Sequence, residues 1–212
     1  MPNPYLVVLD VDSTLIENEV IELLAAEAGS LAEVAAVTER AMRGELDFAQ
    51  SLRERVATLA GLPDSIFEAI RARITVTPGV PELIQGVQRA GGHVGAVSGG
   101  FHEVLDPLAQ RLGLDVWRAN RLEILDGRLT GRVLGDIVDA AAKADSLRSW
   151  AAAMAIPPER TVAIGDGAND LKMMAAAGLS IAFDAKPIVR EQADIALDER
   201  DLSRVLEMIG LR

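Results

Sequence analysis

The chain opens on a short apolar run that ends at two acidic residues. Leu6 to Leu9 are all apolar, and Asp10 and Asp12 follow directly. An unbroken apolar run of this length is typical of a strand buried on both faces of a parallel sheet. Because uncompensated buried charge is costly, the aspartates indicate either an ordinary polar turn or a site for a divalent cation. Strand alternation would place side chains 10 and 12 on the same face.

From position 17 to position 75 the apolar spacing is helical. Apolar residues recur every three or four positions in four segments, which are separated by Gly29, Gly44 and Gly61. Asp47 has the side chain and the position of an N-cap for the third segment. Four helices without a strand predict a small helical cap subdomain, inserted at 17–75 after the first strand.

The rest of the chain alternates between strands and helices. Strands are expected at 93–97, 161–164, around Ile181 and near Ile195. Helices are expected at 80–89, around Pro107, at 147–154, after Pro187 and from Leu202. Alternation of this kind predicts an α/β fold, here a three-layer Rossmann-like core with a mostly parallel sheet, made from 1–16 and 76–212.

Two local signals interrupt this alternation. Asp126-Gly127 is a two-residue turn sequence, and it predicts a β-hairpin between 122–125 and 129–133. Pro107 either kinks the helix around it or begins a new helix with Asp106 as its N-cap.

The composition of the chain excludes several classes of partner and site. The net charge is −11, which argues against a nucleic-acid partner or an anionic membrane. The chain has no cysteine, so disulfides, thiolate zinc sites and a cysteine nucleophile are excluded. Neither a basic leader nor an apolar stretch of about 20 residues is present, and we therefore expect a cytoplasmic protein without a membrane segment.

The polar clusters fall where the predicted strands end. They are Asp10 with Asp12, Ser98 with Gly99, and Asp166 with Asp170. Ligands of open α/β sheets bind beyond the carboxyl ends of the strands, so these clusters should converge.

Convergence of these groups would suit phosphate chemistry. Asp10 and Asp166 are candidate Mg²⁺ ligands. A carboxylate such as Asp10 can attack phosphorus without an activating base, and Asp12 is placed to transfer protons. Ser98 and Gly99 either bind an anion or form an ordinary turn. Lys143 is one of only three lysines, and it is either a site residue or an exposed surface cation.

Taken together and in this order, these motifs resemble those of the haloacid dehalogenase (HAD) superfamily of phosphohydrolases. The matching stretches are Asp10-Val11-Asp12-Ser13-Thr14, Ser98, Lys143, and Gly165 to Asp170. More narrowly, the chain is similar to the phosphoserine phosphatase family along nearly its whole length. Residues 48–56, 97–101 and 119–122 add to this similarity.

The resemblance implies a role for each matching residue. Asp10 would be the nucleophile and Asp12 the acid and base, and Asp10, the Asp12 backbone carbonyl and Asp166 would hold Mg²⁺. The phosphate-binding and leaving-group residues would be Ser98, Gly99, Lys143 and Asn169. Glu19 and Arg55 would bind the ammonium and carboxylate groups of phosphoserine, which are charges of opposite sign to their own. Supporting positions would be Thr14, Asp170, Met42 and Phe48.

Helical geometry independently favours Arg55 as an inward-facing residue. At about 100° per residue, Arg55 lies beside the apolar stripe of its helix, and Arg53 points away. The residue between the two aspartates is Val11, where the family frequently has phenylalanine. Since the chain starts at the catalytic strand, we expect no regulatory amino-acid-binding module before it.

Three other functions stay open at this stage. The enzyme could transfer the phosphoryl group to another hydroxy amino acid such as homoserine, or it could hydrolyse another small phosphomonoester. A non-catalytic sensor of phosphorylated ligands is the third, although the intact set of Asp10, Asp12, Lys143 and Asp166 argues against it. A homodimer is among the arrangements that stay open.

Overall fold

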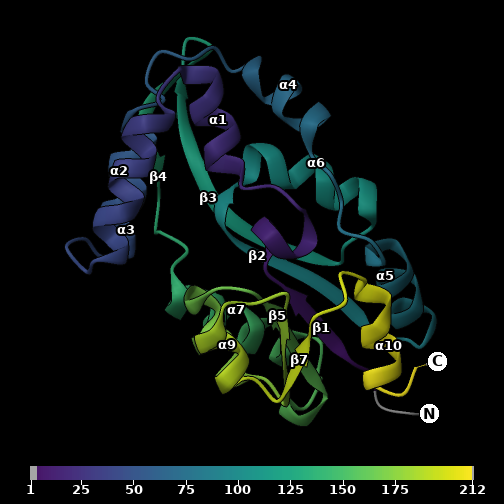
Figure 1. Ribbon diagram of the computed structural model, residues 1–212. Coiled ribbons are helices and arrows are strands. Elements are labelled where there is room, and N and C mark those ends of the chain that lie inside the picture. The colour runs from purple at the N-terminus through teal and green to yellow at the C-terminus, as the bar shows by residue number, and fades with distance from the viewer. Residues whose placement is uncertain (1–3, 212) are drawn as a thin grey trace.

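The computed structural model describes residues 4–211, and within them seven strands form one sheet (Figure 1). The order across the sheet is β4-β3-β2-β1-β5-β6-β7. The strands are β1 (Leu6–Leu9), β2 (His93–Phe101), β3 (Val116–Leu125), β4 (Arg128–Leu134), β5 (Thr161–Gly165), β6 (Leu179–Phe183) and β7 (Ile195–Leu197). All neighbours pair in parallel except β3 and β4, which form the predicted antiparallel hairpin.

The first strand lies at the centre of the sheet, as its apolar sequence predicts. β1 pairs with β2 on one side and β5 on the other, and all four of its residues are buried. Val7 and Leu9 belong to one hydrophobic core, and Leu6 and Val8 belong to a second core on the opposite face. Alternation along the strand therefore serves two cores.

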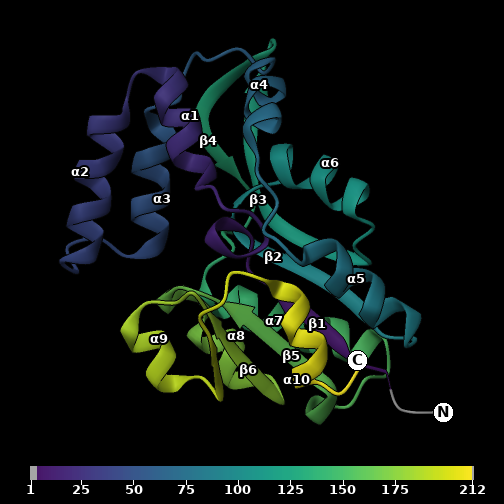
Figure 2. The ribbon, with the colours of Figure 1, turned by 45° about the vertical axis from the view of Figure 1, so that its right-hand side comes forward.

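Helices cover both faces of this sheet (Figure 2). The first core contains side chains of α5 (Val80–Arg89), α6 (His102–Leu112) and α10 (Val205–Met208). The second contains side chains of α7 (Ala140–Ala153), α8 (Leu171–Ala176) and α9 (Pro187–Gln192). The predicted three-layer α/β fold is confirmed.

The helices expected between 17 and 75 are present. They are α1 (Val20–Ala28), α2 (Leu31–Met42), α3 (Phe48–Ala57) and α4 (Ile66–Arg73). The chain enters and leaves this region through two paired segments, since Glu17 N–H donates to the Thr75 carbonyl and Thr77 N–H to the Leu15 carbonyl. Among these helices, α3 contacts β4 of the β3–β4 hairpin, and α4 contacts α6 on the other side of that hairpin (Figures 1 and 2). The division into a core and a cap at 17–75 stays a prediction.

The two Pro107 alternatives are resolved in favour of a continuous helix. Pro107 lies inside α6, and Asp106 does not cap a new helix. Proline has no N–H for the Glu103 carbonyl one turn earlier. That carbonyl instead accepts a hydrogen bond from Arg71 Nη1 of α4, at 3.1 Å.

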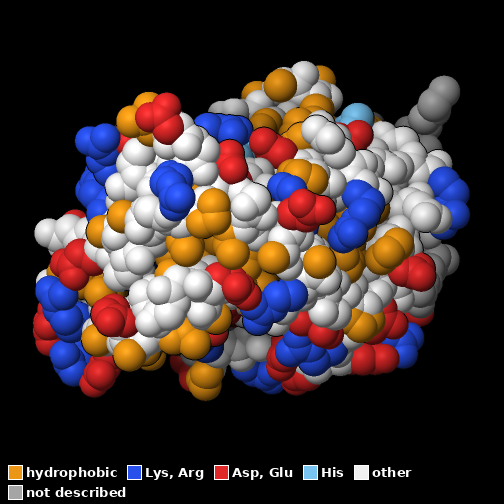
Figure 3. Space-filling model, turned by 90° about the horizontal axis from the view of Figure 1, so that it is seen from above, with side chains coloured by type: hydrophobic (Ala, Val, Ile, Leu, Met, Phe, Trp, Pro, Cys, Tyr) orange, Lys and Arg blue, Asp and Glu red, His pale blue; other side chains and the backbone are white. Residues whose placement is uncertain are grey.

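Residues 4–211 form no membrane-spanning helix, and the face shown in Figure 3 has no single basic area. None of the helices formed by residues 4–211 combines the length and the apolar character needed to cross a membrane. Seen from above, acidic and basic side chains are interspersed with hydrophobic ones rather than gathered into one basic area (Figure 3).

Candidate active site

A cavity of about 260 Å³ lies between the helical region and the carboxyl ends of the central strands. Its lining from the helical side is Glu19, Ile21, Phe48, Leu52 and Arg55. Its lining from the sheet side is Asp10, Asp12, Gly99, Gly100, Phe101, Asp166, Gly167, Asn169 and Lys186. The predicted convergence of polar clusters from distant parts of the sequence is therefore present in the fold.

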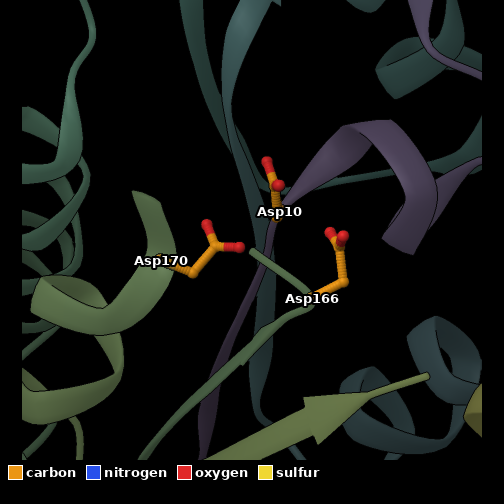
Figure 4. Close-up of side chains that lie close together, drawn as sticks. All are labelled: Asp10, Asp166 and Asp170. Atoms are coloured by element: carbon orange, nitrogen blue, oxygen red, sulfur yellow. The ribbon is translucent and has the colours of Figure 1, made fainter. Parts of the chain in front are cut away.

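Two aspartates of this lining, Asp10 and Asp166, lie close to a third, the fully buried Asp170 (Figure 4). One oxygen from each of Asp10, Asp166 and Asp170 lies within 4.8 Å of the others. Asp10 follows β1, Asp166 follows β5, and Asp170 lies at the start of α8. Because β1 and β5 are adjacent and parallel, their carboxyl ends bring the first two side chains together.

This donor set fits a magnesium ion. Mg²⁺ is bound by hard oxygen ligands, often one or two carboxylates completed by water and phosphate oxygens. The carboxylates in and beneath the cavity outnumber the cations: Asp10, Asp12, Glu19, Asp166 and Asp170 against Arg55, Lys143 and Lys186. A divalent cation would offset this excess of negative charge.

Lys143 is a buried site residue rather than a surface cation. Only 1% of it is exposed, and its Nζ donates to Asp10 Oδ1 at 2.5 Å and to Asp170 Oδ1 at 2.8 Å. Burial by itself would lower the pKa of Lys143, but the two carboxylates outweigh burial and raise it, so the ammonium stays charged. Burial and the charge of Asp170 raise the pKa of Asp10, and Lys143 opposes this rise.

Asp12 reaches the same cavity by a turn, and not by strand alternation as predicted. β1 ends at Leu9, and the turn that follows contains Ser13 in the left-handed region, with φ of 58°. Asp12 Oδ1 accepts the N–H of Val20 at the start of α1, at 3.1 Å. Burial and the charge of Glu19 raise the pKa of Asp12 to about 7. A carboxyl group with that pKa can give and take a proton near neutral pH.

Asp166 is less deeply buried than Asp10. Burial and the charges of Asp170 and Glu19 raise its pKa to about 6. The hydroxyl of Thr14 donates to Asp166 Oδ1 at 3.3 Å, which links the β1 turn to the β5 turn. Thr14 therefore contacts a site carboxylate, in keeping with its predicted supporting position.

The Ser98–Gly100 segment differs from the expected strand-to-helix turn. β2 continues to Phe101, but its register with β3 shifts between Val97 and Phe101. Ser98 is buried, and its Oγ accepts the N–H of Gly100 at 2.7 Å. A methyl group on Gly100 would lie 2.9 Å from Ser98 Oγ and 3.1 Å from Asp12 Oδ2, so a larger residue there would displace these two side chains.

On the helical side the structure places most of the predicted residues at the cavity. Glu19 accepts a hydrogen bond from the Ser13 hydroxyl at 2.6 Å. Burial lowers the pKa of the Arg55 guanidinium, and the nearby charges of Glu19 and Asp12 oppose that change. Phe48 lines the same wall. Met42 does not: it is 81% exposed at the end of α2 and lies outside the cavity lining.

One lining residue had no assigned role in the sequence analysis. Lys186 precedes α9, its charge acts on Asp166, and its N–H donates to the Asp166 carbonyl at 3.2 Å. The scarcity of lysine, which singled out Lys143, was the signal that could have found it.

Comparison with known proteins supplies the family. A model of haloacid dehalogenase-like hydrolases matches residues 7–175, most of the chain and all of the cavity's aspartates. The chain belongs to the haloacid dehalogenase-like hydrolase family. The resemblance inferred from the motifs is thus confirmed.

Similar members of this family carry one activity in their names. A phosphoserine phosphatase of Streptomyces coelicolor is 59% identical over 97% of this chain, which spans only half of that protein's length. One from Streptococcus thermophilus is 55% identical over 96% of this chain and 95% of its own length.

Solved structures of phosphoserine phosphatases are similar to this chain over nearly its whole length. A substrate-bound phosphoserine phosphatase complex has a TM-score of 0.92 at 45% identity, covering 98% of this chain and 99% of that one. A phospho-aspartyl intermediate analogue of phosphoserine phosphatase has a TM-score of 0.90 at 46% identity, covering 97% and 99%.

Proposed function

We propose that the chain is a Mg²⁺-dependent phosphatase that hydrolyses O-phosphoserine to serine and inorganic phosphate. The observation that carries the proposal is the division of the cavity. Its sheet side presents Asp10 and Asp166, with Lys143 bound to Asp10 beneath them, and these residues suit phosphoryl transfer. Its helical side presents Glu19 and Arg55, which complement an amino acid. The names of the similar proteins support the same substrate.

The first half-reaction would use Asp10 and Asp12. Asp10 Oδ1 is held by Lys143 Nζ at 2.5 Å and by the Val11 N–H at 2.7 Å, so we assign the attack on phosphorus to Oδ2. The new Oδ2–P bond forms as the bond from phosphorus to the serine oxygen breaks. Protonated Asp12 gives its proton to that oxygen, and serine leaves.

The second half-reaction would return the enzyme to its starting state. Asp12, now ionised, takes a proton from water as that water attacks the phosphorus of the aspartyl-phosphate. The P–O bond to Asp10 breaks, and inorganic phosphate leaves. Ser98, Gly99 and Lys143 would hold the phosphate, Asn169 would lie near the leaving group, and Asp170 would keep Lys143 in place.

Asp10, Asp166 and the Asp12 carbonyl would hold Mg²⁺, which when bound neutralises negative charge between the attacking carboxylate and the phosphate. Asp170 belongs to the same acidic cluster, but its Oδ1 accepts from Lys143 and its Oδ2 from the Gly167 N–H, at 3.1 Å. Its two engaged oxygens favour a supporting position over direct coordination.

Phosphate release from a panel of small phosphomonoesters, with and without Mg²⁺, tests the proposal. Phosphoserine should be the best substrate, and chelation of Mg²⁺ should abolish its turnover. The proposal is wrong if phosphoserine ranks near the bottom of the panel. Adding homoserine and analysing the products separates hydrolysis from phosphotransfer.

Arg55 offers a sharper test of the substrate. Arg55→Ala should reduce kcat/KM for phosphoserine by about 100-fold, because a charged hydrogen-bonding partner of the carboxylate is lost. Phosphoethanolamine lacks that carboxylate and should be affected much less. Arg53→Ala is the matched control, because Arg53 lies on the same helix, is exposed and does not line the cavity. Equal losses on both substrates would argue against amino-acid recognition by Arg55.

A further inference from the structure

Asn120 of β3 is a buried polar residue that lies outside the cavity and contacts both Gly99, which lines the cavity, and the segment before α7. Only 1% of Asn120 is exposed. Its Nδ2 donates to the Gly99 carbonyl at 2.8 Å, and its Oδ1 accepts the N–H of Val138, also at 2.8 Å. The two partners settle the orientation of the amide, because a carbonyl can only accept and an N–H can only donate.

The first contact is a hydrogen bond to the carbonyl of the Gly99–Gly100 peptide. In a trans peptide the carbonyl and the following N–H point in opposite directions. Here Asn120 holds the Gly99 carbonyl, and Ser98 Oγ holds the Gly100 N–H at 2.7 Å. The register of β2 with β3 shifts over this segment. Two side chains therefore fix a peptide plane at the point where the regular strand pairing is interrupted.

The second contact acts on the segment before α7. Val138 immediately precedes Asp139, whose side chain caps α7 by accepting the Ala142 N–H at 2.9 Å. One turn later α7 carries Lys143, which contacts Asp10. Asn120 thus joins the Ser98–Gly100 segment to the helix that supplies the buried ammonium.

We propose that Asn120 is a positioning residue for the phosphate-binding part of the site. It sets the plane of the Gly99–Gly100 peptide and its spacing from Lys143 without touching the substrate itself. This inference rests on the proposed function only in taking Ser98, Gly99 and Lys143 as the residues that receive a phosphate group. A displacement of such groups by about 1 Å can reduce a rate by about 100-fold.

Asn120→Asp separates the two contacts. The ionised carboxylate has nearly the same shape and still accepts the Val138 N–H, but in that form it cannot donate to the Gly99 carbonyl and repels it. We expect kcat/KM to fall by about 100-fold and the inhibition constant of inorganic phosphate to rise by at least tenfold. The loss should be equal for phosphoserine and phosphoethanolamine, because the change lies at the phosphate.

Ser180→Ala is the matched control. Ser180 is buried toward the amino end of β6, and its Oγ makes two hydrogen bonds with Asp194, at 2.6 and 2.9 Å. The control removes two hydrogen bonds away from the cavity, and it should keep wild-type kcat and phosphate inhibition within about threefold. Thermal unfolding of both variants measures the purely structural effect.

Asn120→Ser is the second variant, which removes the amide but introduces no charge. The proposal is overturned if folded Asn120→Asp keeps kcat/KM within threefold of wild type, or if phosphate inhibition does not change. It is also overturned if neither Asn120 variant folds, because Asn120 would then be a determinant of folding. If the wild-type protein ignores phosphoserine but cleaves another phosphomonoester, the proposed function fails, and the Asn120 comparison is made on that ester.

Discussion

Replacing Lys143 with methionine should expose how strongly the site depends on one buried cation. The side chain is nearly isosteric, so the main change is electrostatic. Lys143 Nζ lies 2.5 Å from Asp10 and 2.8 Å from Asp170, and both carboxylates are buried. Without it, two buried carboxylates face each other with no counterion.

The loss of stability expected for Lys143→Met follows from this buried ion pair. Removing one partner of a buried ion pair costs about 3–5 kcal/mol, a large part of the roughly 5–15 kcal/mol that stabilises a typical domain. For a chain of this size, 1 kcal/mol corresponds to roughly 2–4 °C, so we expect the midpoint of thermal unfolding to fall by about 10 °C. Lys143 is the neighbour that lowers the pKa of Asp10, and its removal should raise that pKa further.

This rise in the Asp10 pKa determines how the stability of the Lys143→Met variant depends on pH. A carboxyl group whose pKa is higher in the folded state than in the unfolded chain binds its proton more tightly when folded. The free energy of unfolding must then fall as pH rises above the unfolded value of about 4. The loss caused by Lys143→Met should be larger at pH 8 than at pH 5.

Urea unfolding at both pH values, in a chelator, measures this effect. Lys172→Met is the control, because Lys172 is an exposed lysine on α8. Adding Asp170→Asn to the Lys143→Met variant removes the second carboxylate and should recover part of the stability. A Lys143→Met loss below about 1 kcal/mol at pH 8, or one that does not depend on pH, would refute the reasoning.

Three other outcomes are expected. Asp10→Asn should form no aspartyl-phosphate from labelled phosphoserine, whereas Asp12→Asn should form it about 10²- to 10⁴-fold more slowly; equal trapping in both variants would contradict the assigned roles. Because the Asp166 pKa is raised to about 6, the metal-free protein should lose stability as pH rises from about 4 to 6, and Mg²⁺ should raise the unfolding temperature more at pH 8 than at pH 5. Gly100→Ala should keep the fold but lower kcat/KM by about 100-fold, because its methyl group would lie 2.9 Å from Ser98 Oγ and 3.1 Å from Asp12 Oδ2; wild-type kinetics would show that the segment adapts.

Much of the architecture could be predicted because local sequence specified it. The apolar run at Leu6–Leu9 is a central strand, and the Asp126-Gly127 turn joins a hairpin. Asp47 caps α3, with its side chain accepting the Gln50 N–H at 2.7 Å. Each of these features depends on residues a few positions apart, so periodicity and turn chemistry are sufficient.

The aspartates of the site could also be predicted, since parallel strands bring their carboxyl ends to one edge. That rule located Asp10 and Asp166, which are 156 positions apart, without knowledge of any distance. It did not give the path of the chain to Asp12. The turn with Ser13 in a left-handed conformation, and not strand alternation, carries that carboxylate to the cavity.

Other features were decided only by the tertiary structure. Sequence alone left Lys143 between a surface and a site position; burial between Asp10 and Asp170 decides it, because a lysine is buried charged only where carboxylates receive it. Met42 is exposed outside the cavity although its helix is amphipathic. Asn120 has no periodic signal, because its partners Gly99 and Val138 lie on other segments. The sequence by itself determined the elements and their polar ends, and long-range packing decided which side chains those ends place together.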